Sequence, residues 1–208
     1  MKKIIIILLL IVLPSALAHQ PRLVQDSTFD NPIIVEDPEV SKAYYGILEG
    51  NSEYYLIETE KEIPIYINIL VPDLENTSLM SAELLDENLT QIYLLDGENF
   101  EWEEFYEPYG MDNYLKGPEL GKHFKSTQNL SEGIYYIRVF NSENIGPYSL
   151  AVGYIESFPI KEILNVLFIL PIIKILIFEK NYLLLLPLIL IISYIYYRKK
   201  YNKKGVKK

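Results

Sequence analysis

Residues 65–71 read Ile65-Tyr66-Ile67-Asn68-Ile69-Leu70-Val71, with a branched aliphatic side chain at every second position. Successive side chains of a strand point to opposite faces of a sheet, so this spacing predicts a strand with one buried face. The same alternation recurs at 135–139, around an outward Arg138, and at 148–154. The chain is therefore expected to build its core from strands.

Shorter apolar runs at 44–48, 53–57, 81–85 and 91–95 bring the expected number of strands to about seven. Turn-forming residues lie between them, for example in Glu49-Gly50-Asn51-Ser52 and Ser131-Glu132-Gly133. Residues 19–157 contain no convincing helical period. This pattern predicts a mainly β protein with an antiparallel β-sandwich over residues 43–157.

Charge and cysteine content exclude several classes of function. Residues 19–157 contain 26 acidic and 7 basic side chains, a net charge of −19 (7 − 26). Such a field repels phosphate backbones, which argues against a nucleic-acid partner. The absence of cysteine removes disulfides, thiol catalysis and cysteine metal sites. No catalytic residues are assigned.

The N-terminal stretch is typical of an export signal. A positive Met1-Lys2-Lys3 precedes an apolar run over 4–13, and Ala16-Leu17-Ala18 supplies the small residues that signal peptidase requires. A cleaved signal peptide over 1–18 would leave His19 first, followed by an N-terminal extension over 19–42. An uncleaved anchor is the alternative, and both place residue 19 onward outside the cytoplasm.

The C-terminal stretch is typical of a membrane anchor. Residues 181–197 are uncharged and predict a single transmembrane helix, and the tail 198–208 carries seven positive charges, which favour the cytoplasm. The apolar segment 158–180 also contains charges. We expect it to form a helix at the outer interface, broken near Pro171, with a re-entrant hairpin as the alternative.

Several strand motifs resemble those of a known family. Tyr45-Gly46-Ile47-Leu48-Glu49-Gly50, and the closing Glu132-Gly133-Ile134-Tyr135-Tyr136-Ile137-Arg138-Val139, are similar to strands of bacterial pre-peptidase C-terminal (PPC) domains. The resemblance covers about residues 43–153 and implies a β-sandwich that accompanies secreted hydrolases, sometimes binding calcium or polymers. The chain departs from the family in its expected anchor and in a long insertion over 97–120. It also resembles uncharacterised prokaryotic membrane-anchored proteins in the region 102–118.

The insertion 97–120 combines acidic and aromatic residues at high density. Phe100 and Trp102 alternate with acids, so on an extended chain both rings face one way, where we expect them to cover the sandwich core. This would make the insertion a loop fastened by aromatic side chains. The alternative is a surface that binds sugars, a partner or Ca²⁺. Its candidate ligand-binding residues are Tyr106, Tyr109, Tyr114, Glu104, Glu107 and Asp112.

A second functional hypothesis starts from the two histidines. If His19 is the first residue, its amine and imidazole together with His123 could form a three-nitrogen copper site. The chain would then be a copper-binding factor or an oxidoreductase. A histidine that follows a cleavage site by chance is the simpler interpretation.

Three sequons, at Asn76, Asn88 and Asn129, are candidate glycosylation sites. Taken together, the sequence favours a membrane-anchored extracytoplasmic sandwich that acts as a binding or interaction module at the cell surface. Its expected partners are the lipid bilayer and an envelope polymer or another membrane protein. No cofactor is required, and copper or calcium is the alternative.

Overall fold

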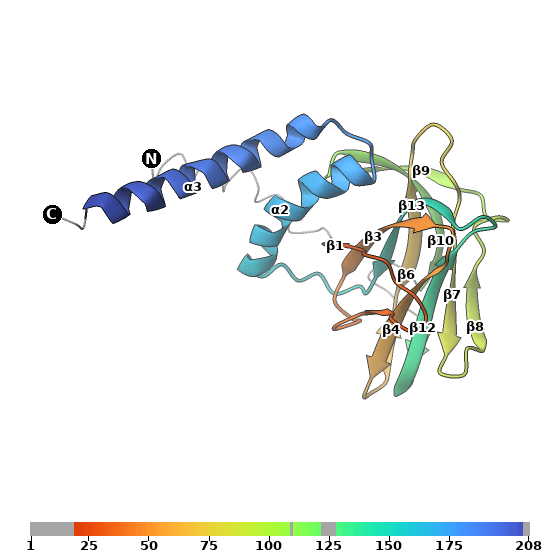
Figure 1. Ribbon diagram of the computed structural model, residues 1–208. Helices are drawn as coiled ribbons and strands as arrows, with labels where there is room; N and C mark the ends of the chain where they lie inside the picture. Colours follow the sequence, from red (N-terminus) through yellow and green to blue (C-terminus); the bar gives the residue numbers. More distant parts are fainter. Residues whose placement is uncertain (1–18, 109, 122–127, 206–208) are drawn as a thin grey trace.

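The computed structural model describes residues 19–108, 110–121 and 128–205, which form a mainly β domain followed by two helices (Figure 1). The first sheet has six strands. Their order is β1 (Gln20–Leu23), β3 (Lys42–Glu49), β13 (Ile145–Val152), β6 (Ile67–Pro72), β10 (Asp112–Leu120) and β9 (Glu103–Glu107).

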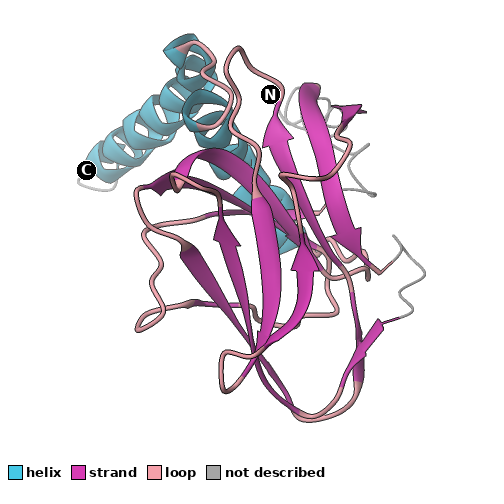
Figure 2. Cartoon of the chain, turned by 90° about the vertical axis from the view of Figure 1, so that its right-hand side faces the viewer, coloured by secondary structure: helices cyan, strands magenta, loops and turns pink. Residues whose placement is uncertain are grey.

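The second sheet has five strands and shares one core with the first, so the domain is a β-sandwich. Its order is β2 (Ile33–Ile34), β4 (Glu53–Thr59), β12 (Gly133–Phe140), β7 (Ser81–Asp86) and β8 (Gln91–Leu95). A short ladder joins β5 (Ile63–Ile65) to β11 (Gln128–Leu130). In Figure 2 the helices lie to one side of the strands.

Both sheets contain parallel as well as antiparallel strand pairs, whereas a purely antiparallel sandwich was predicted. The chain passes from β1 in the first sheet to β2 in the second, then back to β3 and on to β4. Because of these crossings, β1 pairs in parallel with β3 and β2 pairs in parallel with β4. The stretch 19–42 therefore supplies an edge strand to each sheet.

The alternation that predicted the core is confirmed. Ile65, Ile67, Ile69 and Val71 are fully buried, although the strand breaks at Tyr66 between β5 and β6. Asn68 is also buried, and its side-chain amide donates to the carbonyl oxygens of Gly117 and Pro118, each at 3.1 Å. These carbonyls lie at a register shift in β10, so Asn68 satisfies backbone groups that the shift leaves without ladder partners.

A polar network crosses the core between the sheets. The hydroxyl groups of Tyr55 and Tyr148 lie 2.6 Å apart, and the Tyr148 hydroxyl donates to the carboxylate of Glu53. Burial raises the pKa of the Glu53 carboxyl, and the hydrogen bond from Tyr148 offsets this only in part. A carboxyl group with a raised pKa binds more protons in the folded than in the unfolded state.

We expect the wild type to lose stability as pH rises through the raised pKa of Glu53, and we expect Glu53→Gln to abolish this pH dependence. The Glu53 contribution is fully present below the ordinary carboxyl pKa and is lost as pH rises through the raised folded pKa. Glutamine keeps an acceptor for Tyr148 without titrating. Urea unfolding at pH 4 and pH 7 should show the variant gaining on the wild type only at pH 7, while Glu58→Gln, exposed on the same strand, should show no such gain. Parallel pH profiles for Glu53→Gln and wild type would contradict this.

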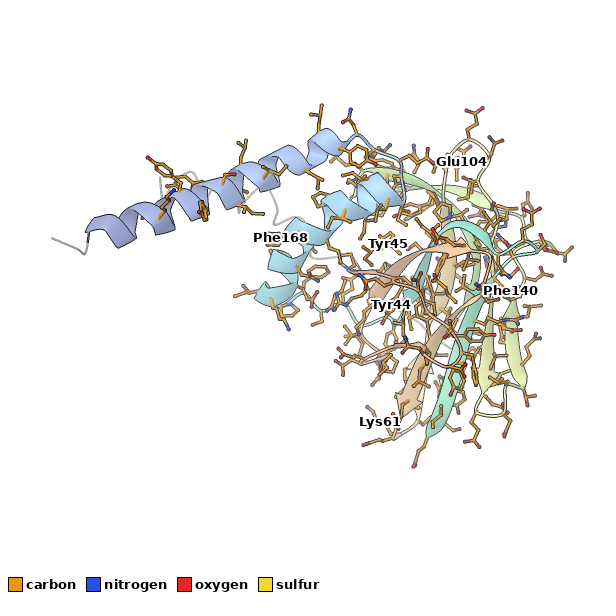
Figure 3. All side chains as sticks on the ribbon, viewed as in Figure 1. Tyr44, Tyr45, Lys61, Glu104, Phe140 and Phe168 are labelled. Atoms are coloured by element: carbon orange, nitrogen blue, oxygen red, sulfur yellow. The ribbon has the colours of Figure 1, made fainter. Side chains whose placement is uncertain are left out.

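Helix α2 (Ile160–Leu176) covers the outer face of the first sheet. Ile173, Ile177 and Phe178 pack against Tyr114, and Tyr45 of β3 packs against the same cluster. Tyr45 is labelled in Figure 3. Two ion pairs fasten α2 to the sheet, one near each end of the helix. These pairs are Arg22–Glu162 at 2.9 Å and Lys174–Asp112 at 2.6 Å.

The predicted break near Pro171 is wrong, because α2 continues through that residue. The proline removes one intrahelical hydrogen bond, but the contacts of the following turns with the sheet hold the helix in place. The predicted interfacial segment 158–180 therefore has one side on the protein itself.

The predicted continuous helix over 181–197 is corrected in its bounds. Tyr182–Leu185 form a 3-10 turn, and α3 (Leu186–Gly205) begins where Pro187 can occupy the first helical turn without losing a hydrogen bond. The basic residues Arg198, Lys199 and Lys200 thus lie inside α3, which projects away from the sandwich (Figure 1). Among the helices of the described residues, none combines the length and apolar character needed to cross a membrane. The predicted signal peptide 1–18 lies outside the described residues.

Candidate binding groove at the edge of the sandwich

An open groove of about 610 Å³ lies where strand β8 of the second sheet faces β10 of the first. Strand β8 lies on the side of the sandwich away from α2 and α3 (Figure 1). The lining of the groove comes from β8, from the segment before β9 and from the shifted part of β10. The lining residues are Tyr93, Leu94, Leu95, Asp96, Asn99, Phe100, Glu103, Lys116, Gly117, Pro118 and Glu119.

Trp102 shapes one wall of this groove by fastening the segment 96–102 onto the core. Its indole N–H donates to the carbonyl of Gly97 at 2.8 Å, and its ring packs against the core cluster. Gly117 lies against the ring so closely that a Cβ there would come within 2.4 Å of it. The prediction that Trp102 covers the core is therefore confirmed, whereas Phe100 is 41% exposed and most of the insertion 97–120 forms strands β9 and β10, not a loop.

The segment that carries Trp102 begins with a compact turn around Asp96. The Asp96 carboxylate accepts hydrogen bonds from the side chain and backbone of Asn99 and from the backbone of Glu98. These bonds, chiefly the one from the Asn99 side chain, lower the pKa of Asp96. Asp96 is therefore a fixed negative charge at the groove, held by the turn itself.

Two aromatic rings line the groove with part of their surface open to solvent. Tyr93 is 42% exposed and Phe100 is 41% exposed. Phe100 stands edge-on to Trp102, with ring centroids 6.4 Å apart and an interplanar angle of 88°. This packing holds Phe100 in place while leaving ring surface available for contact with a ligand.

The charge of the groove is negative. Among the described residues of the lining, Asp96, Glu103 and Glu119 supply three carboxylates and Lys116 is the one cation. Lys116 already pairs with Glu119 at 3.1 Å, and the Tyr66 hydroxyl donates to the same carboxylate. The groove is thus suited to ligands that combine apolar surface with hydrogen-bond donors or positive charge.

Of the six residues predicted to bind a ligand in the insertion 97–120, five are described, and the structure does not bring these five into one site. In the β9–β10 hairpin Asp112 pairs with Glu107 and Asn113 with Tyr106, so neighbouring pairs face opposite sides of the sheet. Asp112 and Tyr114 are buried beneath α2. Glu107 accepts a hydrogen bond from the Gly110 backbone N–H.

Of the other predicted residues, Tyr106 and Glu104 are exposed on the opposite face of β9, with Glu104 at the outer edge of the domain (Figure 3). Tyr109 lies outside the described residues. Tyr93 was not predicted because it belongs to a run that was assigned to the core as a strand, and Glu119 lies at the end of the insertion 97–120, outside the set of residues proposed to bind a ligand there. An exposed tyrosine inside an uncharged strand is the signal that could have pointed to the groove.

No metal site is assembled in the part of the chain that the structure describes, where no three His, Asp or Glu side chains are placed to hold an ion. The imidazole Nδ1 of His19 contacts the Ser41 hydroxyl. His123 lies outside the described residues, so the copper site stays a prediction. The sequon residues Asn76, Asn88 and Asn129 are exposed, and the Asn129 amide donates to Glu62 at 2.6 Å.

No protein-family model matches the chain, and no curated protein sequence matches it. Among solved structures, it is similar to the pre-peptidase C-terminal domain of a collagenase from Bacillus anthracis, with 13% identity and a TM-score of 0.36. That similarity covers 62% of this chain and 97% of the domain. It is also similar to a β-glucosidase from Paenibacillus barengoltzii, with 12% identity, a TM-score of 0.25, and coverage of 62% of this chain and 13% of the glucosidase. The β-sandwich itself is established by the two sheets and their shared core.

Proposed function

We propose that the chain is a binding module of the cell surface, which recognises an envelope polymer or another membrane protein through the groove between β8 and β10. The groove carries the proposal because it combines exposed aromatic rings with carboxylates on a rigid scaffold. Strand β8, which lines the groove, lies on the side of the sandwich away from α2 and α3, so a domain held by its helices would present β8 outward (Figure 1).

The proposal is tested by measuring how the purified chain binds to isolated envelope fractions. Tyr93→Ala and Phe100→Ala remove ring surface worth roughly 1–1.5 kcal/mol each, so binding should weaken about tenfold. Tyr106→Ala is the matched control, because Tyr106 is 57% exposed on β9 and does not line the groove. Protease treatment of the fractions then separates a protein partner from a polymer. Equal binding by wild type and both groove variants would contradict the proposal.

We also propose that the helices attach the module to a lipid bilayer. Both expose large apolar side chains, which are costly in water unless another surface covers them. On α2 these are Ile160, Phe168, Ile172 and Leu176, and on α3 they are Ile189, Leu190, Ile191, Ile192, Tyr194, Tyr196 and Tyr197. The basic residues at the end of α3 would favour contact with anionic headgroups.

Protease digestion of intact cells tests this location. An epitope inserted near Asn51, in the exposed turn between β3 and β4, should be removed because the domain lies outside. An epitope at Lys208 that survives would place the basic tail in the cytoplasm, whereas its removal would place the helices on the outer face. Protection of the Asn51 epitope would contradict an extracytoplasmic domain.

A further inference from the structure

Strand β8 is an edge strand whose protection against pairing is limited to a register shift against β7 at residues 91–93. It ends the second sheet, and within the described residues β7 is the one strand beside it. Its sequence, Gln91-Ile92-Tyr93-Leu94-Leu95, contains no charge and no proline. Ile92 is 50% exposed, Tyr93 42% and Leu94 40%. Natural edge strands normally carry charges, prolines or a cover, because exposed backbone groups recruit other strands.

The other long edge of the sandwich is protected in the usual way. Strand β9 has glutamates at 103, 104 and 107, three of its five positions. At the opposite end of the first sheet, β1 contains Pro21 and Arg22, and α2 is docked beside it. The contrast shows that β8 lacks the charged side chains and the proline that the same domain places on its other edges.

The surroundings of β8 are acidic. Asp96, Glu103 and Glu119 lie in the groove on its inner side, and Lys116 is engaged by Glu119. On the outer face Leu94 lies opposite Glu83, and the neighbouring cation Arg138 is paired with Glu83 at 2.7 Å. A basic segment approaching the edge would therefore meet favourable charge, and an acidic one would be repelled.

We propose that β8 takes up an extended, basic and apolar segment of a partner protein as an added strand of the second sheet. The inference rests on the proposed function, since it names the partner of the same groove. Tyr93 lies opposite the buried Leu84, so it faces the inner side, whereas Leu94, opposite Glu83, faces outward and Ile92 lies at the register shift. Alternate partner side chains would accordingly enter the groove beside Tyr93 or cover Leu94.

A peptide suits this site better than a glycan because the edge offers backbone groups as well as side chains. The five residues of β8 span roughly 17 Å at 3.4 Å per residue, enough for a partner strand of about five or six residues. A glycan would use the rings of Tyr93 and Phe100 but would leave the backbone donors and acceptors of the edge unused. Glycan binding is therefore an outcome that the test must distinguish.

The test uses the purified full chain and a capped octapeptide of alternating valine and lysine. We expect binding, together with slower hydrogen exchange in residues 91–95. The same peptide with N-methylated amides at alternate residues keeps its charge but loses half of its backbone donors, and should bind at least tenfold more weakly. A valine–glutamate octapeptide should not bind.

Matched substitutions locate the binding edge. Leu94→Lys on β8 and Phe105→Lys on β9 add the same charge at side chains of equal exposure, 40% each. Only Leu94→Lys should weaken binding of the octapeptide, by about tenfold, and melting curves confirm that both variants are folded.

Three results would overturn the inference: equal binding by the N-methylated peptide, unchanged exchange in residues 91–95, or equal effects of the two lysine substitutions. Binding of a chitin oligosaccharide that depends on Tyr93, without peptide binding, would assign the groove to a glycan. In that case envelope binding would still require Tyr93 and Phe100, and the proposed function would stand. If envelope binding required neither Tyr93 nor Phe100, the proposed function would be overturned as well.

Discussion

Replacing Asp112 by alanine is expected to weaken the docking of α2 on the first sheet by about 3 kcal/mol, the lower end of the 3–5 kcal/mol typical of a broken buried ion pair. The side chains of Asp112 and Lys174 are 4% and 15% exposed, so the substitution leaves a buried lysine without its counter-charge. Within the described residues, Lys174 would retain the Gly110 carbonyl as the one partner of its side chain. The lower end applies because Asp112 Oδ1 has no partner among the described residues, so the pair is not fully satisfied.

Hydrogen exchange of the α2 amides measures this effect directly, because the helix can open while the sandwich remains folded. Glu39→Ala is the matched control, since it breaks the more exposed pair Lys61–Glu39, whose side chains are 72% and 26% exposed, and should cost less than about 1 kcal/mol. Lys174→Met in the Asp112→Ala background should restore much of the protection by removing the isolated charge. Equal effects of Asp112→Ala and Glu39→Ala would show that the ion pair does not hold the helix.

Much of the strand pattern could be predicted because alternation is a local property. Ile65, Ile67 and Ile69 face the core for the reason their spacing indicates, and the runs at 44–48, 53–57, 81–85 and 91–95 all lie in strands. The parallel edges could not be predicted in the same way. They depend on how the chain crosses between sheets before β3, and residues 20–23 and 33–34 are too few to show a period.

The position of α2 was beyond sequence reasoning for a different reason. An apolar helix has the same sequence pattern whether lipid or a sheet covers it. The contacts that decide the matter join residues far apart in the chain, as Arg22 and Glu162 do. Once α2 is seen on the sheet, Asp112 and Tyr114 become docking residues, although their acidic and aromatic character suggested a ligand site.

Trp102→Ala is expected to destabilise the domain by about 3 kcal/mol, because tryptophan-to-alanine changes in cores typically cost 3–5 kcal/mol and this ring is only partly buried. The substitution removes the ring that packs on the core and against Gly117, and it leaves the Gly97 carbonyl without its indole donor. For a chain of this size the loss corresponds to a fall of roughly 6–12 °C in melting temperature.

Two further variants separate packing of Trp102 from other effects. Gly117→Ala should also destabilise the domain, since a Cβ would lie 2.4 Å from the ring and 2.9 Å from the Ile69 carbonyl oxygen. Phe100→Ala is the control, because the exposed Phe100 ring contributes to the groove and should cost about 1 kcal/mol or less. Thermal melts followed by circular dichroism measure all three. A melting temperature unchanged by Trp102→Ala would mean that the ring does not fasten the segment 96–102, and Trp102 would then join Tyr93 and Phe100 as a candidate for direct contact with the partner.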